Sequence, residues 1–202
     1  MLDFILQFGL TIIIAYLIGS IPTGYLIVKS KTGEDIRTIG SGSTGATNVK
    51  RVLGKKWFFI VLLLDALKGA LPVIMAKTFV TAGAHLGLAP VLASIAVIIG
   101  HSKSCFLGFK GGKSVASGVG TILALNWLVG AIIAVVWAII TYTTKYVSVG
   151  SIIALLISPF LMYFFWAPAA YVAYCGLGAI YIVYLHRENI KRLIAGNENK
   201  VR

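Results

Sequence analysis

Residues 115–144, VASGVGTILALNWLVGAIIAVVWAIITYTT, form an apolar run that is longer than one membrane crossing requires. A transmembrane helix needs about 20 such residues. Asn126 lies inside the run beside Trp127, and a polar residue next to an interfacial aromatic suits a tight turn at the membrane surface. We therefore expect two crossings, the first through a short helix at about 115–126. Such a helix is only ~18 Å long, so either it begins within an indented or re-entrant surface or the bilayer is thinner there.

The whole chain has the composition of a membrane protein. Of its 202 residues, 58% are hydrophobic and 12% are charged, which is more apolar surface than one soluble core can bury. The remaining apolar runs are residues 4–28, 57–80, 86–107, 148–166 and 168–185. These runs predict an all-α polytopic membrane protein that forms a single transmembrane helical domain over residues 1–202.

Basic residues predict the topology. Nearly all lysines and arginines lie in residues 29–56, in residues 101–114, at Lys145 or in the tail after 186. Short loops rich in lysine and arginine stay in the cytoplasm. All four segments are cytoplasmic only if residues 115–144 cross twice, which predicts seven transmembrane helices, the amino terminus outside and the carboxyl terminus in the cytoplasm. The alternative of six spans with both termini inside places several basic loops outside.

The first basic loop contains GSGSTGATN, residues 40–48. It matches G-x-G-x-x-G, with Asp65 at the spacing of a ribose-binding acid, but Asp65 lies in an apolar helical run and no strand precedes the glycines. A dinucleotide fold is therefore not expected. Glycine amides and hydroxyl groups beside Lys50 and Arg51 predict a cradle for a phosphate-like anion. The alternative is a flexible loop with Thr47 or Asn48 as an ordinary helix cap.

The second basic loop is GHSKSCFLGFKGGKSVA, residues 100–116, and His101 enters it. A Walker A loop would need glycine where Leu107 stands, so no such site is present. The Gly111–Gly112 pair between two lysines, leading into the short helix, predicts a second anion site. A solvated basic rim explains the lysines equally well, but not the paired glycines.

Further polar residues fall on the same predicted inner face. Gly19–Pro22 should break the first span, which opens backbone groups towards a cavity. Asp65 and Lys68 are spaced i, i+3 and can pair inside the membrane. Ser148 and Ser151 begin a later span, and HREN, residues 186–189, follows the last one.

These four segments, GSGSTGATN, GHSKSCFLGFKGGKSVA, GSIPTGYL and HREN, resemble those of the bacterial integral-membrane acyl-phosphate:glycerol-3-phosphate acyltransferases over essentially the whole chain. The resemblance implies transfer of a fatty acyl group from acyl phosphate to the sn-1 hydroxyl of glycerol 3-phosphate, giving lysophosphatidic acid and phosphate. It implies no metal, cofactor, acyl carrier protein or nucleic acid. It also implies a multi-pass protein of the bacterial cytoplasmic (inner) membrane whose active site faces the cytoplasm.

The resemblance also implies roles for individual residues. Six residues would hold glycerol 3-phosphate and steady the developing oxyanion. Five of them are predicted to be catalytic, Ser41, Arg51, Lys110, His186 and Asn189, and the sixth, Ser148, is predicted to bind substrate. The acyl-phosphate head group would be held by Ser43, Thr44, Gly45, Ala46, Thr47 and Asn48. The other predicted substrate-binding residues are His101, Gly111, Gly112, Lys113 and Glu188. Either His186 or the departing phosphate takes the hydroxyl proton, and Glu188 is expected to orient Arg187 or a lysine.

Two other classes of function fit the sequence less well than catalysis does. A transporter of phosphorylated metabolites would place its binding groups near the midplane, often between internal repeats, whereas here they cluster at one face and no repeat is visible. A non-enzymatic binder of lipid head groups needs basic loops but no glycine-hydroxyl cradle. An acyl-CoA-dependent enzyme with an H-x4-D box is disfavoured, since no histidine has an aspartate five positions on.

Overall fold

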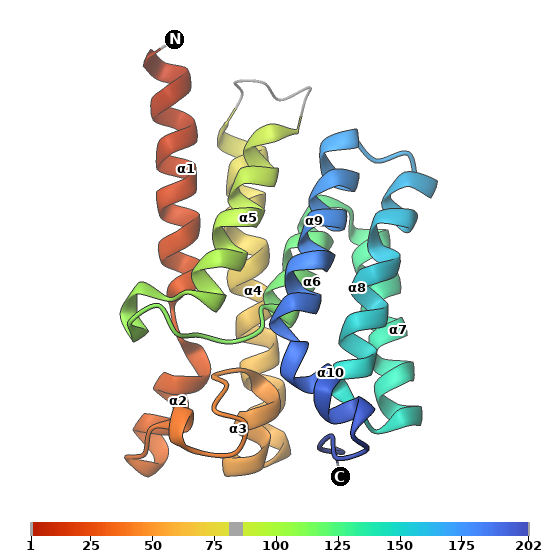
Figure 1. Cartoon of the computed structure of the whole chain (residues 1–202). Coiled ribbons are helices and arrows are strands. Elements are labelled where there is room, and N and C mark those ends of the chain that lie inside the picture. Colours follow the sequence, from red (N-terminus) through yellow and green to blue (C-terminus); the bar gives the residue numbers. More distant parts are fainter. Residues whose placement is uncertain (1, 81–86, 202) are drawn as a thin grey trace. The chain divides into compact units, whose positions relative to one another are not determined.

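The structure, a computed structural model, describes residues 2–80 and 87–201, and in that part of the chain all regular structure is helical (Figure 1). The α-helices are α1 (Leu2–Ser20), α2 (Thr23–Thr32), α3 (Ala46–Leu53), α4 (Lys55–Phe79), α5 (Leu88–Ser102), α6 (Val115–Leu125), α7 (Trp127–Thr144), α8 (Val147–Phe164), α9 (Ala169–Leu185) and α10 (Arg187–Ile194). Two short 3-10 helices, η1 (Ile36–Thr38) and η3 (Cys105–Leu107), lie in the basic loops. The predicted all-α class is confirmed.

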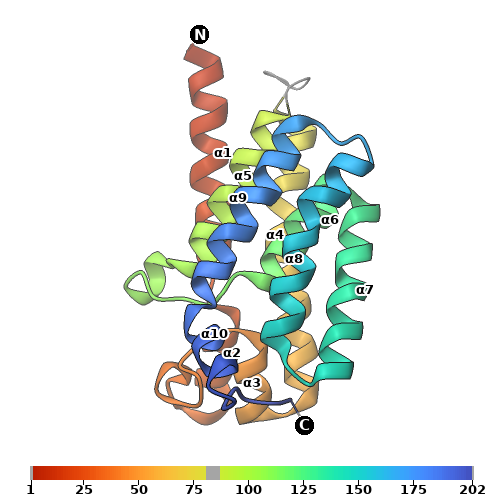
Figure 2. The ribbon, with the colours of Figure 1, turned by 45° about the vertical axis from the view of Figure 1, so that its right-hand side comes forward.

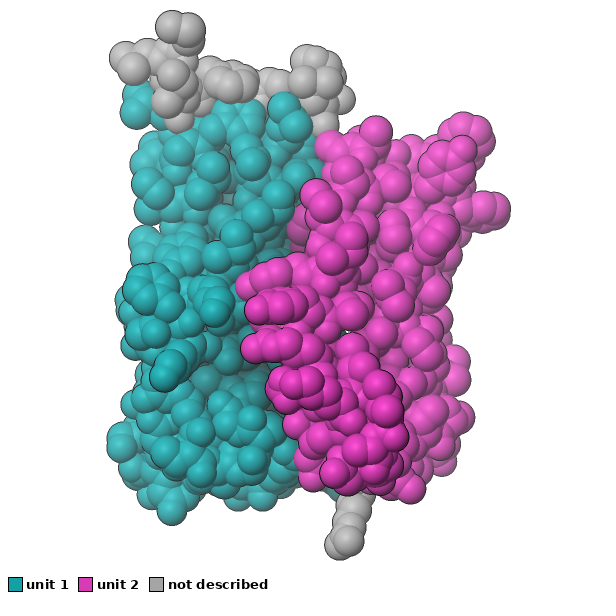
Figure 3. All heavy atoms as spheres, viewed as in Figure 1, with its two compact units in different colours: residues 1–121 teal, residues 122–202 magenta. Residues whose placement is uncertain are grey.

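The chain divides into two compact units, residues 1–121 and 122–202 (Figure 3). In the first unit, α5 packs against both α1 and α4. The contact with α1 is close because it is made by glycines: a Cβ at Gly19 would overlap the Val97 backbone, and one at Gly100 would overlap the Tyr16 carbonyl. Small residues of this kind let membrane helices approach closely. The prediction of one domain over the whole chain stays a prediction.

Helix α6 contacts α4 in the same way within the first unit. A Cβ at Gly69 of α4 would collide with the Ser117 carbonyl, and one at Gly120 of α6 would collide with the Ala66 carbonyl. Both colliding atoms are backbone, which cannot move aside by a rotamer change. The two helices therefore depend on glycine at both positions.

Replacing Gly120 with valine should consequently destabilise the protein, because the helices must separate to admit the side chain. Overpacking of this type costs about 1–3 kcal/mol or more. We expect a lower midpoint of thermal unfolding in detergent. Gly176→Val in α9 is the matched control, since nothing lies within 4 Å of a Cβ built there. Equal thermal midpoints for the two variants would contradict the close contact between α4 and α6.

The second unit is built on α7, α8 and α9, with α8 packed between the other two (Figure 2). Helix α7 begins at Asn126, whose side-chain oxygen accepts hydrogen bonds from the backbone N–H groups of Leu128 (3.1 Å) and Val129 (3.2 Å). The predicted break at Asn126 is confirmed, and this cap is its local cause. Helix α6 ends at Leu125, so it is too short to cross a bilayer alone.

Five helical segments of the described chain are long and apolar enough to span a membrane, and α9 with α10 makes a sixth if that pair, bent by 60°, is counted as one. The five are Leu6–Thr32, Lys55–Phe79, Leu88–Leu107, Trp127–Thr144 and Val147–Phe164. The first contains the predicted break, since α1 ends at Ser20 and α2 begins at Thr23. The chain is therefore a multi-pass membrane protein.

Candidate functional site

The first basic loop is held together by the buried side chain of Asn48, a residue that is 1% exposed and that hydrogen-bonds to the loop backbone. Its amide nitrogen donates to three carbonyl oxygens and its amide oxygen accepts from one backbone N–H. These partners are Ile39 (2.8 Å), Ser43 (3.0 Å) and Ile36 (3.2 Å) as acceptors, and Ser41 (3.1 Å) as donor. Gly40 has a positive φ of 60° and lies against the Asn48 amide oxygen, where a side chain would collide. Asn48 thus shapes the curved backbone of residues 40–45.

The capping alternative for this loop is wrong. The N-cap of α3 is Gly45, which has no side chain to cap the helix. Asn48 lies one turn into the helix and its amide is used on the loop carbonyls instead. Its predicted contact with a substrate head group stays a prediction.

Cations border the loop on its exposed side. Arg51 and Ser41 are exposed, and the Arg51 side chain runs along Gly40, where a Cβ would lie 3.5 Å from its Cδ. Among the described residues Arg51 makes no ion pair. Burial lowers the pKa of Lys50, and repulsion from Lys55 lowers it further. The repulsion from Lys55 shows that positive charge gathers beside this loop, and such charge attracts an anion.

The second basic loop turns back against the end of α5. The Gly112 N–H donates to the His101 carbonyl (3.1 Å), and a Cβ at Gly111 would collide with that same carbonyl. A Cβ at Gly112 would collide with the His101 ring and lie 3.3 Å from the Thr44 hydroxyl. The structure therefore brings the Gly111–Gly112 turn beside Thr44, so the two predicted anion loops are neighbours. Lys110 is exposed and forms no ion pair within the described residues, while Lys113 is half-buried.

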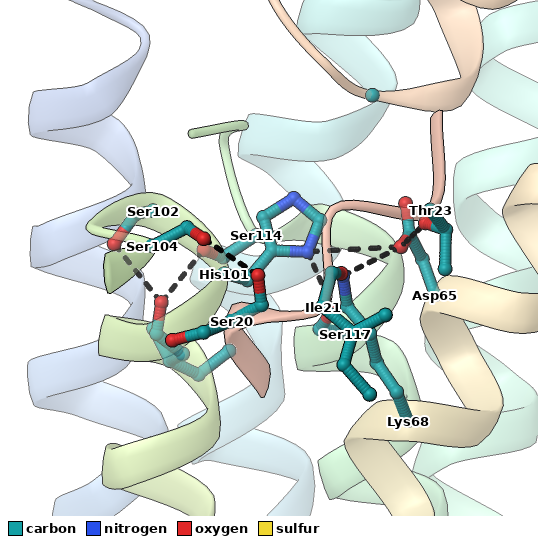
Figure 4. Close-up of polar contacts among 12 residues, drawn as sticks. Ser20, Ile21, Thr23, Asp65, Lys68, His101, Ser102, Ser104, Ser114 and Ser117 are labelled. Carbon is teal, nitrogen blue, oxygen red and sulfur yellow. Dashed lines mark hydrogen bonds and ion pairs between the residues drawn. The ribbon is translucent and has the colours of Figure 1, made fainter. Parts of the chain in front are cut away.

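The placement of His101 in the loop is corrected by the structure. It lies in the last turn of α5 and is 7% exposed, because the helix continues to Ser102. Its Nδ1 is 2.9 Å from the Ser117 hydroxyl of α6 and 3.9 Å from the Asp65 carboxylate of α4 (Figure 4). His101 therefore supports the turn from behind, with one side towards a buried polar cluster.

That cluster contains the predicted Asp65–Lys68 pair, which is confirmed at 2.8 Å between Oδ1 and Nζ. The Thr23 hydroxyl donates to Asp65, and Lys68 donates to the Ile21 carbonyl (2.7 Å). Sequence reasoning did not find Thr23 or Ser117 as members, because neither is charged and each lies far along the chain from its partner.

A second polar cluster forms in the other unit around Glu198, which sequence reasoning also missed. Its carboxylate accepts hydrogen bonds from Asn189 (2.6 Å), Arg192 (2.7 Å) and Ser148 (3.0 Å), and its side chain is 6% exposed. Two predicted site residues, Ser148 and Asn189, are therefore held by one tail carboxylate. The available signal was that Glu198 is one of only two acids, with Glu188, in an otherwise basic tail.

His186 lies at the bend between α9 and α10 and is 3% exposed. Its Nδ1 is 2.8 Å from the Ile182 carbonyl, which only accepts, so Nδ1 carries the proton in the neutral ring and Nε2 carries the lone pair. The Glu188 side chain is exposed and forms ion pairs with Lys191 (3.1 Å) and Arg187 (3.9 Å). Its expected part in orienting those cations agrees with this geometry.

Comparison with known proteins covers nearly the whole chain. Residues 9–196 match the profile of the family described as glycerol-3-phosphate acyltransferase. The chain belongs to that family. A glycerol-3-phosphate acyltransferase of a Nostoc species is 44% identical over 206 residues, covering 96% of this chain and 91% of the relative. The enzyme of Gloeobacter violaceus is 45% identical over 188 residues, covering 93% and 91%.

Solved structures of the family match the fold. The integral membrane glycerol 3-phosphate acyltransferase PlsY (YgiH), in its glycerol 3-phosphate form, has a TM-score of 0.90 at 37% identity, with 96% of each chain covered. Its lysophosphatidic acid form has a TM-score of 0.87 at 35% identity, covering 96% of this chain and 95% of that one. The predicted family and its integral membrane fold are thus confirmed.

In this member of the glycerol-3-phosphate acyltransferase family, Glu198 should make stability depend on pH. Burial alone would raise the pKa of Glu198, but hydrogen bonds from Asn189, Arg192 and Ser148 outweigh it and hold the pKa below 4.5. The pKa of Glu198 is therefore lower in the folded protein than in the unfolded protein. Ionised Glu198 then stabilises the fold fully at a pH above its pKa in the unfolded protein, and this stabilisation is lost as the pH falls through its pKa in the folded protein.

The difference in thermal midpoint between the wild type and Glu198→Gln should therefore be constant from about pH 7 to pH 5 and shrink below that range. Unfolding followed in detergent at several pH values measures it. Glu34→Gln, at an exposed acid, should keep the wild-type profile. Parallel profiles for wild type and Glu198→Gln would contradict the assignment.

Proposed function

We propose that this protein transfers a fatty acyl group from acyl phosphate to the sn-1 hydroxyl of glycerol 3-phosphate, giving lysophosphatidic acid and phosphate. One observation carries the proposal within the first unit. The Gly111–Gly112 turn lies beside Thr44, with Arg51 and Lys110 exposed on the same two loops. Glycine turns, hydroxyls and cations on two neighbouring loops supply the kinds of donor that bind a phosphate group.

Acyl phosphate suits a site of this kind. It is a mixed anhydride, so its phosphate is a good leaving group and no enzyme nucleophile has to be acylated. The acceptor hydroxyl oxygen attacks the acyl carbonyl carbon, the bond from that carbon to the phosphate oxygen breaks, and phosphate leaves with the electron pair. Positioning and stabilisation of the developing negative charge then supply most of the rate.

We assign the head group of the donor to residues 43–48, and the phosphate of the acceptor to Ser41, Arg51 and Lys110. To Ser148, His186 and Asn189 we assign the roles that the family resemblance implies, contact with glycerol 3-phosphate and with the oxyanion. The lone pair of His186 Nε2 makes this atom a proton acceptor for the attacking hydroxyl, and the departing phosphate is the other.

We further propose seven spans, with the amino terminus outside and the site facing the cytoplasm of a bacterial inner membrane. The basic loops support this orientation through the positive-inside rule. The cap at Asn126 supports the count, because it divides residues 115–144 into two helices. The proposed donor reaches the site from the lipid phase, so no acyl carrier protein is required.

Purified protein in detergent, given palmitoyl phosphate, tests the proposal. We expect phosphate release that depends on glycerol 3-phosphate, together with formation of an equal amount of lysophosphatidic acid. Heat-unfolded protein should give neither product. Folded protein that releases no phosphate in the presence of glycerol 3-phosphate would overturn it. Flux of phosphorylated solutes into liposomes would then support transport instead.

A further inference from the structure

The ion pair between Asp65 and Lys68 has no part in the proposed reaction, yet it is almost wholly buried, at 2% and 8% exposed. Such a pair adds little stability by itself, because the cost of removing two charges from water offsets their attraction. Its contacts with the rest of the first unit therefore indicate what it does.

On one side the pair holds the break in the first span. Helix α1 ends at Ser20 and α2 begins at Thr23, so the backbone between them lacks regular helical bonds. Lys68 donates to the Ile21 carbonyl (2.7 Å), and Asp65 accepts from the Thr23 hydroxyl. These two bonds set where α2 starts, and α2 leads into the first basic loop.

On the other side the pair meets His101. The His101 Nδ1 lies 3.9 Å from Asp65 and 2.9 Å from the Ser117 hydroxyl (Figure 4). The His101 carbonyl accepts a hydrogen bond from the Gly112 N–H. The other edge of the ring fills the space where a Gly112 side chain would be. One residue therefore joins the buried pair to the glycine turn.

We propose that Asp65 and Lys68 are positioning residues which set, through Thr23 and His101, how the Gly111–Gly112 turn lies against Thr44. Lys110, to which we assign the phosphate of glycerol 3-phosphate, directly precedes that turn. The pair thereby governs how tightly the protein binds this phosphate, an inference that rests on the proposed function. Because both side chains are buried, we assign them no direct contact with the substrate. Because the bonds that the pair makes keep the turn in place, their loss weakens binding and leaves the chemical step largely unchanged.

The double variant Asp65→Asn/Lys68→Met tests this, because it leaves no buried charge unpaired and is expected to fold. Lys77→Met, at an exposed lysine of the same helix, is the matched control. The readouts are the Kd for glycerol 3-phosphate by titration calorimetry, and KM and kcat with palmitoyl phosphate. Changes that do not touch the ligand alter binding by about 2- to 30-fold, so we expect Kd and KM to rise by roughly tenfold, with kcat within about twofold of wild type.

A folded double variant with wild-type Kd and KM, or one that loses kcat alone, would overturn the proposal. If the double variant does not fold, Thr23→Val replaces it: a raised Kd in the folded protein supports positioning, and an unchanged Kd refutes it. The two proposals fail separately. If wild-type protein binds glycerol 3-phosphate but releases no phosphate from palmitoyl phosphate, the proposal that acyl phosphate is the donor is refuted. The comparison of Kd values then still decides the role of the Asp65–Lys68 pair.

Discussion

Replacing Arg51 or Lys110 with alanine is expected to lower turnover by about 10²–10³-fold while the fold stays intact. Both side chains are exposed, and neither makes an ion pair with another described residue, so their removal leaves no buried partner unsatisfied. Each stands at an anion loop, where a positive charge stabilises the phosphate and the charge that develops in the transition state. Phosphate release from palmitoyl phosphate, with glycerol 3-phosphate varied, measures the loss.

Lys103→Ala is the matched control for Lys110, since it removes an exposed lysine from the same loop. Its kcat/KM should remain near wild type. Unchanged thermal midpoints in all three variants would show that the loss is not caused by unfolding. Wild-type activity in both Arg51→Ala and Lys110→Ala would exclude the assignment of the site to these two loops.

Replacing Glu198 with alanine should have the second large effect. The Glu198 carboxylate is the shared acceptor for Ser148, Asn189 and Arg192, and truncation leaves those donors facing a buried space. Leaving one buried polar group unsatisfied costs about 1–3 kcal/mol, and more when the group is charged. We expect a clear fall in the thermal midpoint together with loss of activity, because two of the three donors are predicted site residues.

Glu198→Gln separates shape from charge in this cluster. It keeps one acceptor oxygen and the side-chain volume, so its midpoint should lie between those of wild type and Glu198→Ala. Glu34→Ala removes an exposed acid and should change neither stability nor activity. A midpoint for Glu198→Ala equal to that of wild type would show that the tail carboxylate does not hold the unit together.

Much of the fold follows from local properties that can be read along the chain. Apolar length and the positions of lysine and arginine predict the helices and their ends, since a bilayer requires helices of limited length with internally bonded backbone. The turn at Asn126, the break after Ser20 and the i, i+3 pair of Asp65 and Lys68 were found for this reason. Each depends only on neighbours in the chain.

The sequence also predicted the two anion loops, because glycine, hydroxyl and cationic residues indicate phosphate binding wherever the backbone can turn. What it could not supply were contacts between segments far apart in the chain. Thr44 beside Gly112, Thr23 and His101 around Asp65, and Glu198 with Ser148 are such contacts. Asn48 shows the same limit, since its amide bonds to loop carbonyls rather than capping a helix.

The sequence by itself therefore determined an all-helical membrane protein of the glycerol-3-phosphate acyltransferase family, and it predicted two anion loops and a terminal polar segment. Only the tertiary structure decided that a buried ion pair lies behind the glycine turn, and that a tail carboxylate holds Ser148 and Asn189. The physical reason is the separation along the chain over which each kind of interaction acts. Hydropathy and turn propensity act between neighbours, whereas a buried polar group takes whichever partner the packed helices bring within hydrogen-bonding distance.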